Sequence, residues 1–240
     1  MVLNNSEFLQ ALADNDIYLS QQQENQFERY FELLVETNKL YNLTAITERN
    51  DVYLKHFYDS LTLAIYVRGL ARTDISLIDV GTGAGFPSLP LKILFPDLKI
   101  TMIEALNKRV SFLKKVIEEL NLDGVTVIHG RAEDLAHDKN YREKFDYATA
   151  RAVARTSVLA EYTLPFVRLN GDLLVMKGSA ADDELVAGKQ ALTLLGGRLE
   201  EQFDFKLFNN DPRVIQVVKK VKETPRKYPR QAGIPSRKPL

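Results

Sequence analysis

The chain has 240 residues, with 32 basic and 32 acidic side chains and a formal net charge of zero. This balance excludes a global field that would draw the whole molecule to nucleic acid or to a membrane, and the absence of cysteine excludes disulfides and thiolate metal sites. No apolar run approaches the roughly 20 residues that span a bilayer, and the first residues lack the basic and apolar parts of a signal peptide. We therefore expect a cytoplasmic protein without membrane contacts.

The charges are distributed unevenly along the chain. Residues 1–60 contain ten acidic and four basic side chains, whereas residues 213–240 contain nine basic and one acidic. An acidic start and a basic end make a dipolar molecule. On charge alone, the basic end is equally consistent with a solvated terminus and with a binding segment.

Residues 6–68 are expected to be helical. Ser6 is expected to cap a first helix, and a second helix is expected over 21–41. Thr47 or Asn50 is expected to cap a third helix. The second helix has apolar residues at the three- and four-residue spacing of a buried face, namely Phe27, Tyr30, Phe31, Leu34 and Val35.

From Ile75 the pattern changes to short apolar runs that alternate with amphipathic stretches. Helices and strands in alternation predict an α/β fold, with a doubly wound, mostly parallel, seven-stranded sheet after an N-terminal helical extension. The strands are expected over 76–80, 98–105, 125–130, 145–151, 171–178, 198–208 and 213–221. The helices are expected over 87–95, 107–122, 156–169 and 182–195.

A glycine-rich turn follows the first strand, in the stretch LIDVGTGAGFP. Glycine lets the backbone approach a ligand, and the next helix offers its N-terminal amides. Dinucleotide-binding turns have the spacing G-x-G-x-x-G, but Gly81, Gly83 and Gly85 give G-x-G-x-G. Asp79, inside the strand, would repel a pyrophosphate and can hold a cationic amino-acid group, directly or through water. The turn therefore favours S-adenosylmethionine over NAD.

Acidic residues also follow the second and third strands. Glu104 ends the second strand and can accept both ribose hydroxyls of a nucleoside. Ala132 and Glu133 follow the third strand, where backbone amides and a carboxylate can read an adenine edge. Each acid is also consistent with a solvated strand end or a helix start. Because the carboxyl ends of parallel strands share one edge of the sheet, we expect these residues to join the glycine turn in one site.

Several motifs occur together and in order: YNLTAIT, HFYDSL, LIDVGTGAGFPSLPL, EALNKRVSFL, GRAED, ARAVA, KG and YPRQAGIPSRKPL. With them the chain resembles the bacterial guanine-N7 methyltransferases of small-subunit ribosomal RNA, the glucose-inhibited division protein B family. The resemblance covers most of the chain. It implies a Rossmann-like methyltransferase fold, S-adenosylmethionine as cofactor with S-adenosylhomocysteine as product, and methylation of a guanine N7 in 16S ribosomal RNA. It also implies cofactor contacts at Gly81, Phe86, Ala132, Glu133 and Arg151, with Glu104 as the ribose ligand.

The chemistry at guanine N7 depends on positioning. Its lone pair is free, so in-line methyl transfer needs no general base, and a donor to O6 would anchor the base. Arg151, Arg155 and Lys177 follow the fourth and fifth strands and are candidate catalytic residues. Arg155 is equally consistent with a helix-start salt bridge, and Lys177 with a solvated strand end. His56 is a fourth candidate, although a packed, hydrogen-bonded role is the more common one for such a histidine.

The basic C-terminal tail is expected to contact RNA through phosphates and through base stacking on its tyrosine. Its prolines favour an extended strap over a helix, and its deletion is expected to leave cofactor binding nearly unchanged. The candidate RNA-binding residues are Arg226, Lys227, Tyr228, Arg230, Arg237 and Lys238. His129 and His137 have no partners at metal-ligand spacing, so no metal is predicted.

The predicted organisation has three parts. A helical extension over 1–70 packs on an S-adenosylmethionine-dependent methyltransferase domain over 71–222, and a basic strap covers 223–240. We expect a monomer that acts on 16S ribosomal RNA or on the small ribosomal subunit. Three alternatives stay open at this point: a small-molecule methyltransferase, a non-catalytic module that binds ribosomal RNA or a nucleoside, and an NAD oxidoreductase.

Overall fold

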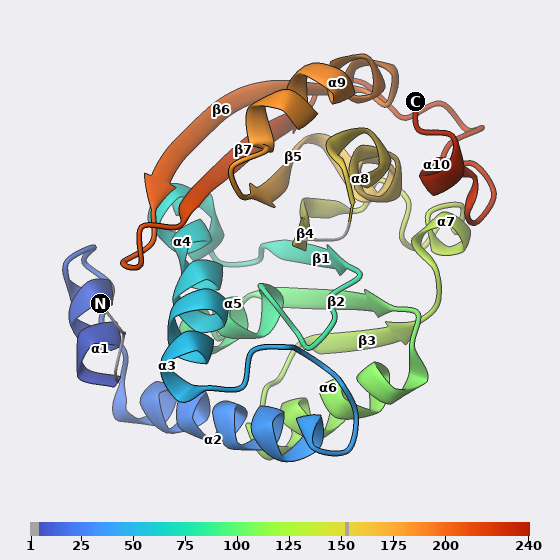
Figure 1. Cartoon of the computed structure of the whole chain (residues 1–240). Helices are drawn as coiled ribbons and strands as arrows, with labels where there is room; N and C mark the ends of the chain where they lie inside the picture. Colours follow the sequence, from blue (N-terminus) through green and yellow to red (C-terminus); the bar gives the residue numbers. More distant parts are fainter. Residues whose placement is uncertain (1–4, 152–153) are drawn as a thin grey trace.

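A central sheet with helices on both faces organises the computed structural model (Figure 1), which describes residues 5–151 and 154–240 and contains seven strands within them. The strand order is β3-β2-β1-β4-β5-β7-β6. The first five strands run parallel, and β7 runs antiparallel to both β5 and β6. The predicted doubly wound, mostly parallel sheet is therefore confirmed. The strands are β1 (Ser76–Val80), β2 (Lys99–Glu104), β3 (Val125–His129), β4 (Phe145–Arg151), β5 (Val167–Lys177), β6 (Gly197–Lys206) and β7 (Pro212–Lys220).

The side chains of the strands alternate between two hydrophobic clusters, as a period of two residues requires. In β1, Leu77 belongs to one cluster, whereas Ile78 and Val80 belong to the other. The second cluster is covered by α7 (Ala132–Leu135), α8 (Thr156–Thr163), the 3₁₀ turn η3 (Leu164–Phe166) and α9 (Ala181–Leu194). The first cluster is covered by α2 (Gln21–Asn38), α4 (Asp59–Tyr66), α5 (Ser88–Leu94) and α6 (Asn107–Glu119), with α1 (Asn5–Ala13), α3 (Arg49–Val52), the π-helical turn η1 (Tyr53–Tyr58) and the 3₁₀ turn η2 (Arg68–Ala71).

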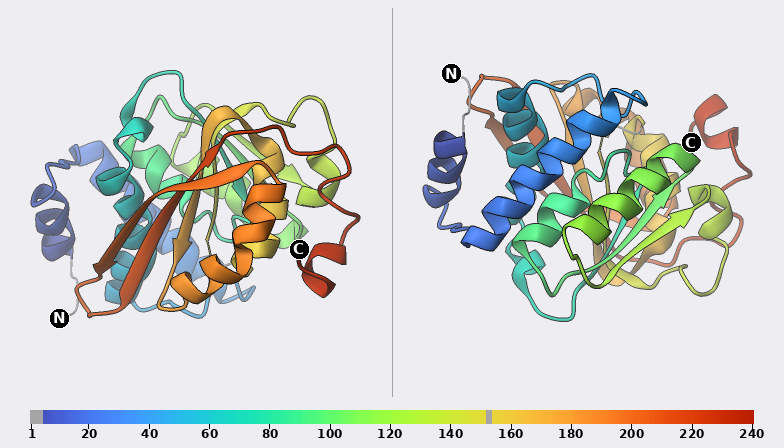
Figure 2. Two further views of the ribbon diagram at one scale, coloured as in Figure 1. Left: turned by 90° about the horizontal axis from the view of Figure 1, so that it is seen from above. Right: turned by 90° about the horizontal axis from the view of Figure 1, so that it is seen from below.

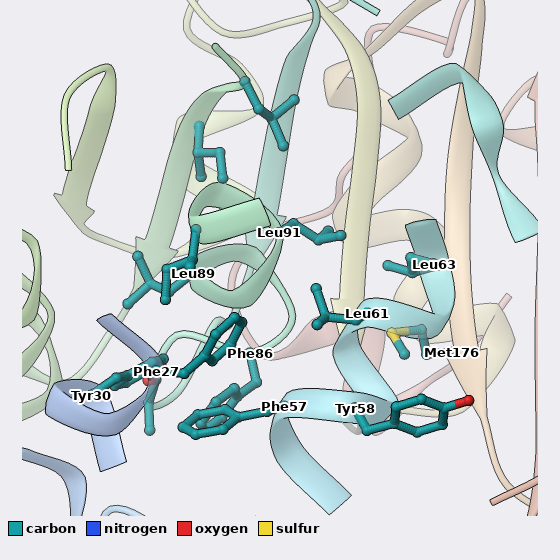
Figure 3. Packing of buried hydrophobic residues seen from close by; sticks show 14 of the residues in the cluster. Phe27, Tyr30, Phe57, Tyr58, Leu61, Leu63, Phe86, Leu89, Leu91 and Met176 are labelled. Carbon is teal, nitrogen blue, oxygen red and sulfur yellow. Dashed lines mark hydrogen bonds between the residues drawn. The ribbon is translucent and has the colours of Figure 1, made fainter. Parts of the chain in front are cut away.

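The N-terminal helices share their hydrophobic core with the sheet. Helices α2 and α6 run side by side across one face (Figure 2, right). Phe86, at the end of the glycine turn, stacks on Tyr30 of α2 with ring centres 5.4 Å apart and lies near Phe57 of η1 (Figure 3). The Tyr30 hydroxyl donates a 2.5 Å hydrogen bond to the carbonyl of Ala84. The glycine turn thus rests on the N-terminal helices, and the domain boundaries stay a prediction.

Several predicted helix ends are wrong. Ser6 lies inside α1, which begins at Asn5. Helix α3 begins at Arg49 after Glu48, so neither Thr47 nor Asn50 caps it.

The second helix does have a side-chain cap that the sequence analysis missed. Ser20 and Gln23 form a capping box at the start of α2, in which each side chain accepts a backbone amide of the other residue. The helix expected over 156–169 stops at Thr163, and Pro165 then stands in η3. Because proline has no amide hydrogen, it cannot continue the helical hydrogen bonds.

The C-terminal segment is tied to the body of the protein. Arg142 donates hydrogen bonds to the carbonyls of Thr224, Pro225 and Tyr228. The buried Lys220 ammonium donates to Thr224, and burial lowers the pKa of Lys220 to about 8. The segment then forms a four-residue helix, α10 (Ile234–Arg237), which corrects the expectation of an extended strap. Its prolines do not prevent this helix, because Pro235 stands in the first turn, where no amide donor is needed.

Candidate active site

A cleft of about 500 Å³ opens at the carboxyl ends of β1, β2 and β3 and is lined in part by α7. In Figure 1 these strand ends point toward the side of the molecule where α7 lies. It is lined by predicted cofactor residues from four separate strand ends and by residues of the N-terminal region. These include Thr44, His56, Gly81, Gly83, Phe86, Glu104, Ala132, Glu133, Arg151 and Tyr162. The open α/β sheet thus has its cleft where ligands of such sheets bind.

All three glycines of the turn have left-handed backbone conformations, with φ of 70° at Gly81, 63° at Gly83 and 98° at Gly85. A Cβ atom on Gly83 would meet nothing within 4 Å, whereas one on Gly85 would lie 2.5 Å from Leu89 Cδ1 and 2.6 Å from the Tyr30 hydroxyl. Gly81 and Gly83 line the cleft, but Gly85 does not. Gly85 is therefore needed for packing against helices, and Gly83 for open space in front of the turn.

Asp79 lies beneath the glycine turn and does not line the cleft. Its Oδ2 accepts hydrogen bonds from the hydroxyls of Thr82, over 2.7 Å, and of Ser88. Oδ1 is buried without a partner among the described residues. Burial raises the pKa of Asp79 to about 7. In this structure the residue fastens the turn to α5, so direct contact with a bound ammonium group does not follow from its position.

Glu104 forms the floor of the cleft. Its carboxylate is almost fully buried and accepts the amides of Gly83, over 3.0 Å, and Leu106, over 2.9 Å. Arg109 lies 3.6 Å from the same carboxylate. The strand-end acid is thus rigidly positioned, and each oxygen keeps a second lone pair.

Ala132 and Glu133 begin helix α7 at the other end of the cleft. Glu133 accepts the amide of Gly233 over 3.0 Å, and the hydroxyl of Tyr162 lies 2.8 Å from that of Ser236. The C-terminal segment therefore supports two residues that line the cleft, Glu133 and Tyr162, without lining it itself. These contacts argue against the expectation that loss of the tail leaves cofactor binding nearly unchanged, and that expectation stays to be tested.

Arg151 is the most connected side chain of the site. Its Nη1 donates to the carbonyl of Lys55 over 3.0 Å and to Asp59 over 3.1 Å. Its guanidinium carbon lies 5.0 Å from the ring centre of Phe86. Burial lowers the pKa of Arg151, and the carboxylate of Asp59 opposes that shift. A forked cation is thus held at the wall of the cleft by groups from η1 and α4.

His56 lies in the π-helical turn η1 and stacks on Phe86 with ring centres 4.4 Å apart. His56 Nδ1 lies 3.1 Å from Arg151 Nη2 and 3.2 Å from the carbonyl oxygen of Lys55. Because a guanidinium can only donate, the contact with Arg151 requires the ring proton on Nε2, which lies 2.9 Å from Oγ1 of Thr44. Burial, followed by the charge of Arg151, lowers the pKa of His56 to about 3. His56 is therefore a neutral ring at physiological pH and cannot serve there as a general acid.

A second cavity of about 520 Å³ adjoins the first and shares His56 and Arg151 with it. Lys177 lines this cavity, and its Nζ donates to the carbonyl of Ala154 and to Glu184 Oε2, both over 2.6 Å. Arg213 also lines it and donates to Asp59 over 2.9 Å. Arg155 is exposed and lines neither cavity. The structure thus brings Arg151, His56 and Lys177 together and leaves Arg155 outside.

The candidate RNA-binding residues of the tail fall into two groups. Tyr228 is only 6% exposed, so in this conformation it is not available to stack on a base. Arg230 forms a 2.6 Å ion pair with the fully buried Glu161. The residues that remain exposed are Arg226, Lys227, Arg237 and Lys238.

Among the residues of the two cavities, Thr44, Glu184 and Arg213 were not predicted from the sequence. Thr44 stands in the quoted motif YNLTAIT, which was a usable signal. Glu184 had only its place in the first turn of a helix, and Arg213 its place in a basic segment. Neither of those patterns separates a site residue from a solvated one.

Residues 23–209 match the protein family described as rRNA small subunit methyltransferase G, GidB. The chain belongs to this family. Ribosomal RNA small subunit methyltransferase G of Leuconostoc citreum is 66% identical over 233 residues, which are 97% of this chain and 98% of the relative. The protein of the same name from Lactococcus lactis subsp. cremoris is 55% identical over 235 residues, 98% of either chain. The predicted family and the predicted enzyme class, an rRNA methyltransferase, are thereby confirmed.

A solved structure shares the fold of this GidB family member. The 16S rRNA (adenine(1408)-N(1))-methyltransferase from Catenulisporales acidiphilia superimposes with a TM-score of 0.53 at 13% identity, over 69% of this chain and 92% of that chain. In residues 5–151 and 154–240, no helix is long and apolar enough to cross a membrane. No metal-binding group of three or more histidine, aspartate or glutamate side chains occurs in that same part of the chain.

Proposed function

We propose that this protein transfers the methyl group of S-adenosylmethionine to N7 of a guanine in 16S ribosomal RNA. The proposal is carried by the two adjoining cavities, which share His56 and Arg151 at the carboxyl ends of parallel strands. A methyl group can pass between two ligands only where their sites meet. Membership of the GidB family supports ribosomal RNA as the acceptor.

The first cavity suits S-adenosylmethionine. Glu104 has two oxygens that each accept one backbone amide and can each accept one ribose hydroxyl in addition. Gly83 leaves open space where a side chain would otherwise stand. Ala132 and Glu133, at the start of α7, offer an amide and a carboxylate to the edge of an adenine.

The second cavity suits the acceptor base. When bound, S-adenosylmethionine supplies a methyl group on a positively charged sulfur and leaves as S-adenosylhomocysteine. The guanine N7 lone pair forms the new N–C bond as the S–C bond breaks. The electrons of the S–C bond go to sulfur, and the methylated base carries the positive charge. No proton is removed, so the neutral His56 is sufficient and the chain has to position the two reactants.

Arg151 and Lys177 are the donors proposed to anchor the base through O6, an atom that arginine and lysine also bind in nucleic-acid recognition, which leaves the N7 lone pair free to react. Arg151 also lines the cofactor cleft, so it is assigned to both ligands. The exposed Arg226, Lys227 and Arg237 of the C-terminal segment are assigned to RNA phosphates, together with Lys238. A ribosomal RNA substrate supports a cytoplasmic location, which is part of this proposal.

The test is methyl transfer with labelled S-adenosylmethionine to 16S ribosomal RNA, supplied free and in small subunits. Mapping by chain cleavage at N7-methylguanine is expected to find label at a guanine N7. Label at another atom, or none in either substrate, would contradict the proposal. Calorimetry with S-adenosylmethionine and with NAD checks the cofactor separately, and binding of NAD alone would also contradict it.

A further inference from the structure

The second cavity contains a carboxylate for which the proposed function has no task, that of Glu184 in α9. The Glu184 side chain is 25% exposed and lines the cavity. Its Oε2 accepts from Lys177 Nζ over 2.6 Å and from the Thr156 amide over 3.2 Å. Within the described residues, the hydrogen bonds of this carboxylate are all made by Oε2. Oε1 thus accepts from none of the residues in 5–151 and 154–240, and with respect to these residues it is available to a ligand.

Glu184 lies away from the point where the two cavities meet. His56 and Arg151 line both cavities, whereas Lys177 and Glu184 line only the second. A guanine whose N7 faces the cofactor directs its N1–H and its N2 amino group toward the opposite side of the base. Those two donors would thus face the part of the cavity that Glu184 lines.

Lys177 and Glu184 present a hydrogen-bond pattern that matches guanine. A donor, the Lys177 ammonium, stands beside an acceptor, the Glu184 carboxylate. The matching edge of guanine has an acceptor at O6 and donors at N1 and N2. Adenine has a donor at N6 and an acceptor at N1. The Lys177 donor would therefore face a donor, and the Glu184 acceptor would face an acceptor. Two of the three ammonium protons of Lys177 are engaged by Ala154 and Glu184, which leaves the third for O6.

We propose that Glu184 determines base specificity by accepting hydrogen bonds from N1–H and from the N2 amino group of the target guanine, while Lys177 donates to O6. This inference rests on the proposed function, because it assumes that the second cavity holds the acceptor base. A base other than guanine would then be rejected, because Lys177 and Glu184 would lose their hydrogen bonds to the base while it shields them from water.

The test uses inosine, which keeps N7, O6 and N1–H but lacks the N2 amino group. Ribosomal RNA carrying either guanosine or inosine at the mapped methylation position is compared by kcat/KM. The wild-type protein is expected to prefer guanosine by about 10-fold or more. In Glu184→Gln the amide presents a donor to the base, and the preference is expected to fall to about 2-fold or less while calorimetric affinity for S-adenosylmethionine is unchanged.

The matched control is Asp183→Asn. It removes the same charge from the same turn of α9, but Asp183 is exposed and lines neither cavity. It is expected to keep the full preference for guanosine.

Two results would overturn the inference: a wild-type protein that methylates inosine as well as guanosine, or a Glu184→Gln protein that keeps the wild-type preference. The first needs no variant, so the inference stays testable even if Glu184→Gln fails to fold. A wild-type protein that methylates no guanine N7 would instead contradict the proposed function itself.

Discussion

Arg151 donates a hydrogen bond to Nδ1 of His56 over 3.1 Å, and both groups lie against the ring of Phe86. The bond requires an unprotonated Nδ1, so the charge of the pair belongs to Arg151 alone. Arg151 comes from the end of β4 and His56 from the N-terminal helices. The relationship therefore joins the two halves of the site around a single cation.

Replacement of Arg151 by lysine is expected to show whether the site needs only a positive charge or also the planar shape of the guanidinium. Arg151→Lys keeps the charge but loses the planar fork that reaches Lys55, His56 and Asp59. We expect methylation to fall by about 10-fold or more. Arg155→Lys is the matched control, because Arg155 is exposed and lines neither cavity. Equal activity of the two variants in the methyl-transfer assay would contradict the role of Arg151.

The low pKa of His56 predicts a loss of stability toward acid. The folded protein holds this ring neutral down to about pH 3, whereas the unfolded chain binds a proton near pH 6.5. Between these values the unfolded state binds more protons, so the free energy of unfolding falls as pH falls, by up to about 1.4 kcal/mol per pH unit from this group. Urea denaturation of His56→Gln between pH 7 and pH 4 is expected to lack this part of the slope.

His129→Gln serves as the control for the acid measurement, because His129 is exposed. Its denaturation midpoints are expected to follow the wild-type pH dependence. If His56→Gln also follows it, the ring is not held neutral as inferred.

Two alanine substitutions in the glycine turn are expected to impair different properties, stability in one variant and cofactor affinity in the other. Gly85→Ala places a methyl group 2.5 Å from Leu89 and 2.6 Å from Tyr30 at a φ of 98°, so it should cost about 2–4 kcal/mol of stability. Gly83→Ala meets nothing within 4 Å and should cost only about 1–2 kcal/mol for its left-handed backbone. Its methyl group instead enters the space beside the cleft, and affinity for S-adenosylmethionine should fall by about 10-fold or more. Thermal denaturation and calorimetry separate the two effects, and a Gly83→Ala protein with wild-type affinity would argue against this placement of the cofactor.

Deletion of residues 231–240 is expected to weaken cofactor binding several-fold, because it removes the Gly233 amide from Glu133 and Ser236 from Tyr162. The control is the double variant Arg226→Ala with Lys227→Ala, whose side chains are exposed. It should bind S-adenosylmethionine normally but bind RNA more weakly, with a salt dependence reduced by about two counterions. Calorimetry and RNA titration at several salt concentrations measure both. Unchanged cofactor affinity after the deletion would instead support the first expectation, in which the segment contacts RNA and leaves cofactor binding nearly unchanged.

The sequence was sufficient to predict those parts of the site that depend on a single strand and the turn that follows it. The G-x-G-x-G turn, Glu104 and Ala132 each follow a strand with a clear apolar run, and parallel strands bring such ends to one edge. All of them line the cleft except Gly85, which packs against Tyr30 instead. That difference depends on where α2 lies, and local spacing does not encode it.

The remaining part of the site depends on contacts that no local pattern specifies. Arg213 reaches Asp59 across 154 positions of the chain because β7 inserts between β5 and β6. Strands were expected over 198–208 and 213–221, but their order in the sheet was not. Glu184 likewise enters the second cavity only because α9 packs beside α8 and β6. Tertiary packing decides such pairs, and it also buries Tyr228, which composition alone marked as available.

The hydrogen bond from Tyr30 to Ala84 joins residues 54 positions apart, and it bears on how such an enzyme can change over evolutionary time. A recombination event near residue 70 would deliver a glycine turn without the helix on which it rests. The glycine turn of this protein therefore keeps its position through its own N-terminal helices, and a different leading segment would have to supply an equivalent contact.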